Sequence, residues 1–296
     1  MADKTYDYYN KHTFWNNHYI VREYINVLAT GDKNVGWMKY VRDKYFIDKH
    51  KIKVLSVGCG NGWQDRDLDK VFNFDHLTGY DISESLLKEA REKCSSKKYE
   101  YKRADLNQVS FNEKEYDLAI NVAALHHVEN MESIVRETSR ALKKDGLFVH
   151  FDYIGPKRNQ YSDNDLYWMN WIKENLPESL VGKEKIERPN IEVMLKEDSS
   201  EAVGSEDIIP TLGKYFDFER LRYFNGGLMY QVLYNKVQNF DPKNEIQNSL
   251  LKVCLQLEKE MTRSGKIKPL FAFMVCKKKK KNILGTILAG RKRSGG

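Results

Sequence analysis

The sequence predicts a doubly wound α/β fold with a mostly parallel, seven-stranded sheet, helices on both faces and an antiparallel last strand. Three observations support this fold. Between residues 53 and 152, short apolar runs alternate with segments of helical periodicity, which is typical of parallel sheets. The first of these runs leads directly into a glycine-rich turn. Two more apolar runs follow a polar stretch that contains three prolines.

Each expected strand is a short run rich in β-branched and aromatic residues. In chain order the runs are KVLSVG, HLTGYD, YEYKRAD, YDLAIN, LFVHFDY, FDFERLRYF and LFAFMVCK. Helices are expected from Phe14 to Phe46, as one or two segments, and over residues 227–263. A crossover helix is also expected before the fifth strand, closed by the basic residues and glycine at 143–146, with one apolar face made of Ile134, Thr138, Ala141 and Leu142.

We expect one domain over residues 1–276 and a basic tail over 277–296. The domain would consist of N-terminal helices (1–48), a strand core (49–155), a lid-like insertion that crosses one edge of the sheet (156–216) and late strands and helices (217–276). The tail carries eight positive charges and no acids, so the net charge of +7 leaves residues 1–276 nearly neutral. Runs of like charge usually stay solvated and unfolded, although a basic and apolar pattern could also contact an anionic membrane surface.

Composition narrows the class of protein. No run reaches the roughly 20 apolar residues that cross a bilayer, and the charged N-terminal segment does not resemble a secretory signal, so we expect a cytoplasmic protein, at most peripheral to the inner membrane face. The four cysteines have no CxxC spacing, so we predict reduced thiols and no metal site. The nearly neutral body disfavours a nucleic-acid partner.

The sharpest motif is VLSVGCGNGW, in which a strand runs into Gly58, Gly60 and Gly62. Residues without a Cβ let the backbone turn tightly and approach a ligand closely. The spacing is GxGxG, and Trp63 stands where the dinucleotide motif GxGxxG requires its last glycine. The loop therefore predicts a nucleoside-containing cofactor, although a tight structural turn would also explain it.

Acidic residues follow the next two expected strands. Asp81 comes 19 residues after Gly62, a distance at which a carboxylate can accept hydrogen bonds from both ribose hydroxyls. Asp105 follows one strand later and could accept from an adenine amino group, while the Leu106 N–H donates to the ring. Either acid alone could be a helix cap or a solvated loop residue. Their order along three successive strand ends favours a cofactor site.

These motifs resemble the class I S-adenosylmethionine-dependent methyltransferases of the type 11 and type 12 groups, through VLSVGCGNG, GYD, RADL and YDLAINVAALHHV. The resemblance implies a methionine site at the glycine loop, ribose at Asp81, adenine at Asp105 and Leu106, and a sulfonium beside Asn121. Ser56 is a departure, because most relatives have Asp or Glu there. The implied cofactor set is Ser56, Val57, Gly58, Cys59, Gly60, Gly62, Asp81, Ile82, Asp105, Leu106 and Asn121.

The predicted activity is methyl transfer from S-adenosylmethionine to an oxygen of a small-molecule or carbohydrate-type acceptor. The later segments resemble members associated with polysaccharide biosynthesis, which suggests the sugar. Candidate general bases are His126, His127 and Asp152, because ligands bind outside the carboxyl ends of parallel strands, although an ionised acceptor would need no base. Candidate acceptor-binding residues are Arg158, Gln160 and Glu201.

Two other functions stay open at this stage. A nucleic-acid methyltransferase would use the basic tail as a guide, but the sequence lacks an [ND]PPY-type base-flipping motif. A non-catalytic protein that binds the cofactor, or has lost it, would explain Ser56. The oligomeric state is not predicted.

Overall fold

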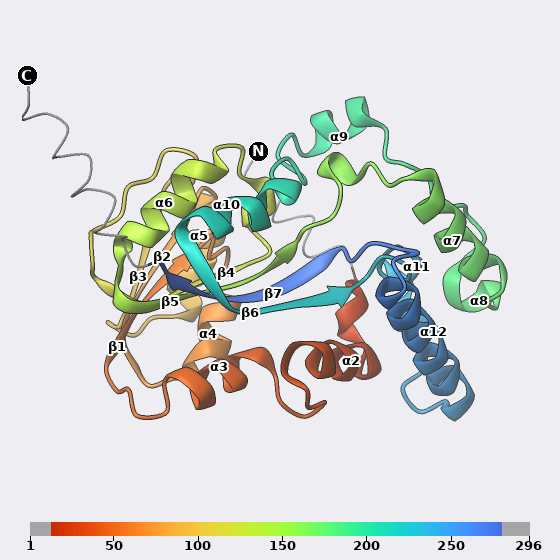
Figure 1. Cartoon of the computed structure of the whole chain (residues 1–296), viewed down its shortest axis with the longest axis horizontal. Coiled ribbons are helices and arrows are strands. Elements are labelled where there is room, and N and C mark those ends of the chain that lie inside the picture. The colour runs from red at the N-terminus through yellow and green to blue at the C-terminus, as the bar shows by residue number, and fades with distance from the viewer. Residues whose placement is uncertain (1–12, 280–296) are drawn as a thin grey trace, which may run out of the picture.

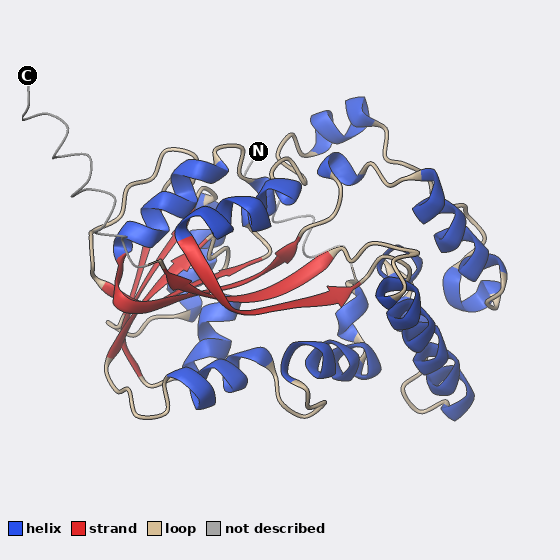
Figure 2. Ribbon diagram, in the orientation of Figure 1, coloured by secondary structure: helices blue, strands red, loops and turns tan. Residues whose placement is uncertain are grey.

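The computed structural model describes residues 13–279, which form a seven-stranded sheet in the order β3-β2-β1-β4-β5-β7-β6. Figure 2 shows this sheet with helices on both sides. The strands have the following bounds: β1 Ile52–Val57, β2 Phe74–Asp81, β3 Tyr99–Arg103, β4 Tyr116–Val122, β5 Leu142–Tyr153, β6 Phe216–Asn225 and β7 Phe271–Lys278. Every strand expected from the sequence is present.

Pairing within the sheet is parallel from β3 to β5 and antiparallel at β7. Strand β7 lies between β5 and β6 and runs against both. This confirms the predicted fold class, including the antiparallel last strand. The carboxyl ends of β1 to β5 therefore meet at one edge, where the glycine loop and the expected acids follow the strands.

Two apolar cores fill the faces of the sheet. Alternate residues of β1 divide between them, because Val54 packs toward one face and Leu55 toward the other. The first core holds α2, α3, α4, α5, α11 and α12, and the second holds α6 and α10; Figure 1 shows α2 and α3 below the sheet and α6 and α10 above it. The bounds are α2 Tyr19–Thr30, α3 Trp37–Tyr45, α4 Trp63–Asp69, α5 Glu84–Lys93, α6 Met131–Ala141, α10 Ile208–Tyr215, α11 Met229–Leu233 and α12 Glu245–Arg263.

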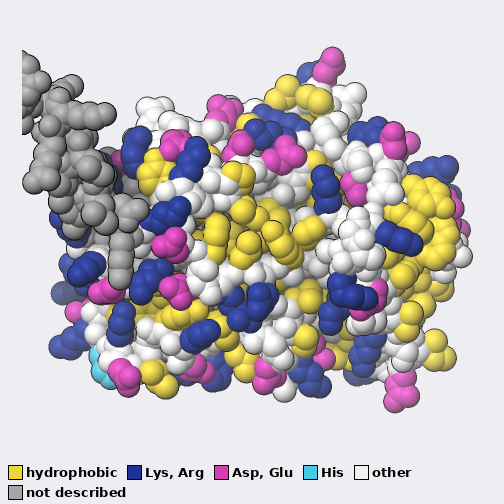
Figure 3. Space-filling view, in the orientation of Figure 1, with side chains coloured by type: hydrophobic (Ala, Val, Ile, Leu, Met, Phe, Trp, Pro, Cys, Tyr) yellow, Lys and Arg dark blue, Asp and Glu magenta, His cyan; other side chains and the backbone are white. Residues whose placement is uncertain are grey.

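The insertion after β5 contains three helices, α7 Asp163–Glu174, α8 Glu178–Val181 and α9 Ile191–Glu197. Its returning chain is bound to the carboxyl end of the sheet, where the Gly204 N–H donates to the His126 carbonyl at 2.9 Å. The insertion therefore meets the ends of the strands, where we had expected it to cross an edge. Apolar side chains remain exposed on α7 and α9, including Tyr167, Trp171 and Val193, and Figure 3 shows apolar clusters over both helices.

Three details differ from the sequence prediction. Leu142 was expected in a helix but begins β5, because it pairs with Tyr116 of β4. The expected long helix over 227–263 is interrupted between α11 and α12, where the backbone runs through the short 3₁₀ turn Val237–Asn239 and Pro242 before Asn244 caps α12. Lys277 and Lys278 lie in β7, although the expected domain division placed both in the tail and the expected strand LFAFMVCK ended at Lys277.

The rest of the basic tail, and with it the predicted unfolded segment or membrane contact, lies outside the described residues. Within residues 13–279, no helix has the length and apolar character that a bilayer span requires.

Candidate active site

The glycine loop joins β1 to α4 at the carboxyl edge of the sheet. Gly58 has a φ of +70°, and a Cβ added to it would lie 2.3 Å from the Cβ of Ala124. Only glycine fits there, so the loop packs directly against the segment after β4. A Cβ on Gly60 would meet nothing closer than 4.0 Å, which leaves open space above the loop for a ligand. Gly62 is the N-cap of α4.

Asp81, at the end of β2, is tied to the loop. Its Oδ2 accepts from the Gly60 N–H at 2.8 Å and its Oδ1 from the Ser83 N–H at 2.9 Å. Burial raises the pKa of this carboxyl, and the backbone N–H donors partly offset the effect. The adjacent Ile82 side chain is 55% exposed, so an apolar surface lies beside the carboxylate.

Asp105 and Leu106 follow β3, as expected. The Oδ1 of Asp105 accepts from the N–H and the side-chain amide of Asn107, which holds the acid in a local turn. The Leu106 side chain reaches the space above Gly58. Asn121 of β4 also lies beside that glycine, and its Nδ2 donates to the Val57 carbonyl at 2.7 Å.

The Oδ1 of Asn121 is buried and has no hydrogen-bond partner within the described residues. An unpartnered buried acceptor is costly, so its presence beside the loop indicates a position that a ligand could complete. Val57, the last residue of β1, and Cys59, within the loop, are both buried.

An acid that the sequence analysis missed stands beside Ser56. The Ser56 hydroxyl donates to Asp65 Oδ1 at 2.7 Å, and the Tyr101 hydroxyl donates to Asp65 Oδ2 at 3.0 Å. Burial raises the pKa of Asp65 to about 6, while these two donors oppose the rise. The first turn of α4 thus supplies a carboxyl group next to the serine, which weakens the argument that Ser56 marks a lost cofactor site.

His126 and Asp152 form a buried pair behind the loop. His126 lies on the 3₁₀ turn η2 (Leu125–His127) after β4, and its Nδ1 lies 2.5 Å from Asp152 Oδ1 on β5. Asp152 also accepts from the Leu125 and Tyr153 N–H groups, each at 2.8 Å. Burial alone would lower the pKa of His126, but the Asp152 carboxylate raises it to about 9.

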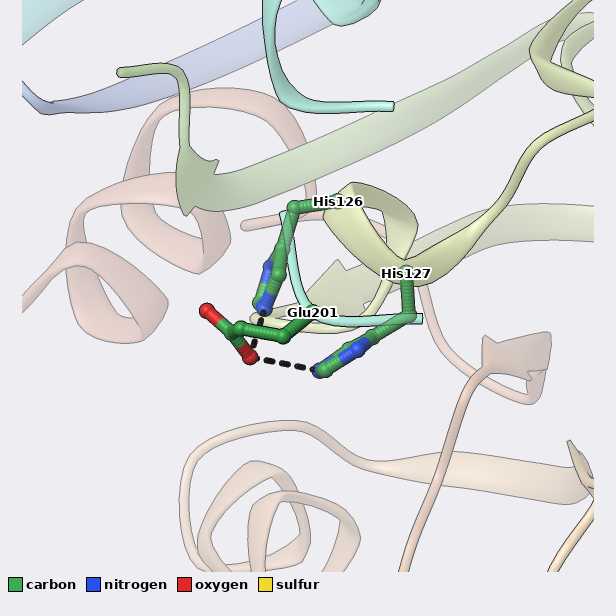
Figure 4. Close-up of side chains that lie close together, drawn as sticks. All are labelled: His126, His127 and Glu201. Atoms are coloured by element: carbon green, nitrogen blue, oxygen red, sulfur yellow. Dashed lines mark ion pairs between the residues drawn. The ribbon is translucent and has the colours of Figure 1, made fainter. Parts of the chain in front are cut away.

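His127 and Glu201 complete a cluster around His126. The Oε2 of Glu201 lies 3.8 Å from the Nε2 atom of each histidine, and Figure 4 shows both rings with these atoms directed at that carboxylate. The His127 Nδ1 lies 3.1 Å from Ser200 Oγ. The sequence predicted Glu201 as an acceptor-binding residue, and in the structure its carboxylate lies beside these two histidines.

Arg158 and Gln160, predicted to bind the acceptor, are engaged by the insertion itself. The Arg158 guanidinium donates to the carbonyls of Ser199 and Glu201, at 2.7 and 3.2 Å. The Gln160 amide donates to the carbonyls of Arg158 and Pro189, both at 3.0 Å. In this structure Arg158 positions the 199–201 segment and Gln160 links the backbone at Arg158 and Pro189. Acceptor binding by either side chain stays a prediction.

A hollow of about 510 Å³ lies away from these residues, between α7 and residues 185–188. None of its lining residues belongs to the strand ends, so it is separate from the cluster described above.

Comparison with known proteins identifies the core. A methyltransferase domain model matches residues 55–150, the segment that runs from the glycine loop to the middle of β5. Residues 55–150 therefore correspond to the methyltransferase domain of class I S-adenosylmethionine-dependent enzymes. The chain is 28% identical over 98 residues to the malonyl-[acyl-carrier protein] O-methyltransferase of Bacillus cereus, covering 33% of this chain and 36% of that protein.

A second curated relative of this chain is the sterol 24-C-methyltransferase of Gibberella zeae, with 29% identity over 122 residues, 40% of this chain and 31% of that protein. The chain thus spans about a third of the length of these two relatives. Among solved structures, phosphoethanolamine N-methyltransferase 2 of Haemonchus contortus, in complex with S-adenosyl-L-methionine, superposes with a TM-score of 0.51 and 16% identity, over 88% of this chain and 57% of that one. This likeness supports the fold.

Proposed function

We propose that this methyltransferase transfers a methyl group from S-adenosylmethionine to an oxygen atom of a small-molecule or carbohydrate-type acceptor. The observation that carries the proposal is the hydrogen bond between Gly60 of the glycine loop and Asp81, because it places open backbone beside a carboxylate. In this proposal the loop receives the methionine part and Asp81 accepts from the ribose hydroxyls. Asp105 and Leu106 flank the adenine, and Asn121 lies beside the sulfonium.

The acceptor oxygen is inferred from the His126 and Asp152 pair. An alcohol must lose a proton as it attacks the methyl carbon, and a neutral histidine oriented by a carboxylate can take that proton. Because the pKa of His126 is raised to about 9, the neutral form of its ring becomes more populated as the pH rises toward that value. The names of the relatives include an O-methyltransferase and a C-methyltransferase, so family membership alone leaves the atom open. The sugar class rests on the looser resemblance of the later segments.

The reaction itself is an in-line displacement. The acceptor oxygen forms a bond to the methyl carbon as the carbon–sulfur bond breaks, and the sulfur keeps that electron pair as neutral S-adenosylhomocysteine. The hydroxyl proton passes to a base or to water. The protein's part is to align the two reactants and exclude water from the path, which can supply several kcal/mol of the rate enhancement.

Titration calorimetry with S-adenosylmethionine tests the cofactor site. Asp81→Ala should weaken binding at least tenfold, because losing a hydrogen-bonded carboxylate costs about 1.5 to 3 kcal/mol. Asp75→Asn, at an exposed position of the same strand, is the matched control and should bind as the wild type does. Equal affinities for the wild type and a folded Asp81→Ala protein would refute the proposed ribose site.

Product analysis tests the acceptor. Isotope-labelled S-adenosylmethionine is incubated with the protein and a panel of sugars, lipid-linked sugars, fatty acids and short nucleic acids, and labelled products are identified by mass spectrometry. Label on an oxygen of a small molecule supports the proposal. Label on nucleic acid, or cofactor binding without transfer to any class, would favour one of the two alternatives named from the sequence.

A further inference from the structure

We propose that His126, His127 and Glu201 bind a divalent transition-metal ion such as Zn²⁺. The three side chains each offer one ligand atom, and these atoms lie within 4.8 Å of one another. They come from the turn after β4 and from the returning end of the insertion, which the fold brings together over 70 residues apart in sequence. Two histidines and one carboxylate are a common ligand set for zinc and for related divalent ions.

Hydrogen bonds on the far side of each ring orient the histidines as ligands. The Nδ1 of His126 faces Asp152, which can only accept while ionised, so Nδ1 carries a hydrogen, and in the neutral, metal-binding form of the ring Nε2 carries the lone pair. Ser200 Oγ donates to Asp198 Oδ1 at 2.6 Å, so its oxygen is free to accept from Nδ1 of His127. A carboxylate or hydroxyl behind a ligating histidine is the usual support of a metal site.

Three acceptor atoms thus face one another. Within residues 13–279, neither Nε2 atom has a hydrogen-bond donor, and the 3.8 Å separations from Glu201 are too long for hydrogen bonds. Lone pairs that converge in this way repel unless a cation lies between them. A single extra proton on one ring could form a hydrogen bond across only one of the two separations, whereas a metal ion could bind all three ligand atoms.

The size of the space fits a metal ion. A triangle with two sides of 3.8 Å and a third of at most 4.8 Å has a point roughly 2 to 2.5 Å from each corner. Zinc binds histidine nitrogen and carboxylate oxygen at about 2.0 to 2.2 Å, so a shift of a few tenths of an ångström would close the site. No backbone rearrangement is required.

The cluster is also held firmly and left open on one side. The Arg158 guanidinium donates hydrogen bonds to the carbonyls of Ser199 and Glu201, and the Asn159 amide donates to Glu201 Oε1 at 3.4 Å. The side chains of His127 and Glu201 are 25% and 33% exposed, so an ion would be reached from solvent and could keep a free coordination position. Open positions distinguish catalytic from purely structural zinc sites.

The free position gives the ion a role that rests on the proposed methyl transfer. An acceptor hydroxyl bound to the ion would have a lowered pKa and release its proton to water. The oxygen would then attack the methyl carbon of the sulfonium, giving a methyl ether and S-adenosylhomocysteine. His126 would act in this case as a ligand, with Asp152 as its positioning residue, and the metal would replace a general base.

Metal titration of the full-length protein tests the site. Protein purified without a polyhistidine tag and stripped with a chelator is titrated with ZnCl₂ by calorimetry and with CoCl₂ by visible absorption, which reports the ligand geometry. We expect one high-affinity ion per chain. Glu201→Gln and His127→Ala should each weaken Zn²⁺ binding at least tenfold, Asp152→Asn should weaken it by roughly 10- to 100-fold, and the exposed Glu206→Gln control should bind normally.

Circular dichroism and melting curves establish that each variant is folded. Wild-type protein that binds Zn²⁺ no more tightly than folded Glu201→Gln and His127→Ala, or that binds none, overturns the metal site. Affinity for S-adenosylhomocysteine is measured in parallel on the stripped protein. Loss of that affinity would refute the proposed function while leaving the metal result intact, and metal failure would leave the cofactor result intact.

Discussion

The proposed cofactor half of the site (residues 52–122, here the cofactor half) and the proposed acceptor half (residues 123–216, here the acceptor half) are built in different ways. In the cofactor half, groups at the ends of neighbouring strands are joined by hydrogen bonds to backbone carbonyls. The Gly58 N–H donates to Tyr80 at 2.8 Å, and the Asn121 side-chain amide donates to Val57 at 2.7 Å. In the acceptor half, a short turn meets an insertion that returns over 70 residues later, through His127 and Ser200.

The difference indicates which half can vary. Sheet topology fixes the cofactor half, so any chain with this strand order and glycine loop obtains nearly the same geometry. The acceptor half depends on the sequence and length of one insertion, and a change there alters the ligands without disturbing the sheet. Four substitutions test how separable the halves are.

The largest effect is expected from His126→Ala in the acceptor half. Turnover with an acceptor identified by product analysis should fall by roughly 10² to 10⁴, whether the ring is a base or a metal ligand. Affinity for S-adenosylmethionine should stay nearly unchanged, because Asp152 keeps its bonds to Leu125 and Tyr153. Calorimetry beside steady-state kinetics measures both, and a matching loss of cofactor affinity would show that the halves are coupled.

Gly58→Ala disrupts the contact between Gly58 of the cofactor half and Ala124 of the acceptor half. The new methyl group would meet Ala124 at 2.3 Å on a backbone with positive φ, which should destabilise the fold by about 2 to 4 kcal/mol and weaken cofactor binding. Denaturant unfolding and calorimetry measure the two effects. Gly58→Ala combined with Ala124→Gly should recover the part due to the clash, and no recovery would mean that backbone strain alone is responsible.

Asp65→Asn tests the acid beside Ser56. The pKa of Asp65 is raised from 3.8 to about 6, so the protonated carboxyl stabilises the folded state at low pH and this contribution is lost as pH rises through 6. The asparagine variant cannot ionise. Between pH 4 and 7 the wild type should lose about 2 to 3 kcal/mol of unfolding free energy relative to the variant. Parallel stability curves from urea unfolding would argue against a buried, ionising Asp65.

The smallest effect is expected from Lys157→Ala, which removes an ion pair with Asp207 between the start and the end of the insertion. Both side chains are about half exposed, so the change should alter unfolding free energy by less than about 1 kcal/mol, and less still in high salt. Metal and cofactor affinities should not change. A larger loss would mean that surface charge, beyond the backbone bonds of Arg158, holds the acceptor half in place.

The arrangement of strand ends in the proposed cofactor half could be predicted from the sequence because its signals are local. Asp81 and Asp105 each follow a recognisable strand, and parallel strands bring their ends together whatever lies between them. Asp65 was missed because it lies inside a helix, and only the turn of α4 carries it to Ser56. Ser56, at a position where most relatives have an acid, was the available signal. A search for acids in the first turn of the following helix would have found Asp65.

The acceptor half was less predictable because its contacts are long-range. Nothing near Glu201 in the chain indicates that its carboxylate meets two histidines, and the prediction that no metal binds considered only cysteine spacing. Leu142 was assigned to the wrong element for a related reason, since its pairing with Tyr116 outweighed the helical pattern that precedes it.

The position of β7 in the sheet also affects how the chain folds during its synthesis. Strand β5 lies between β4 and β7, yet β7 is synthesised more than a hundred residues later. While the ribosome is still producing the insertion and α12, one edge of β5 has no neighbour, and the apolar residues Leu147, Phe148 and Val149 lie along it. An open strand of this kind pairs readily with other chains. A chain terminated before Phe271 should therefore aggregate rather than fold into a smaller protein.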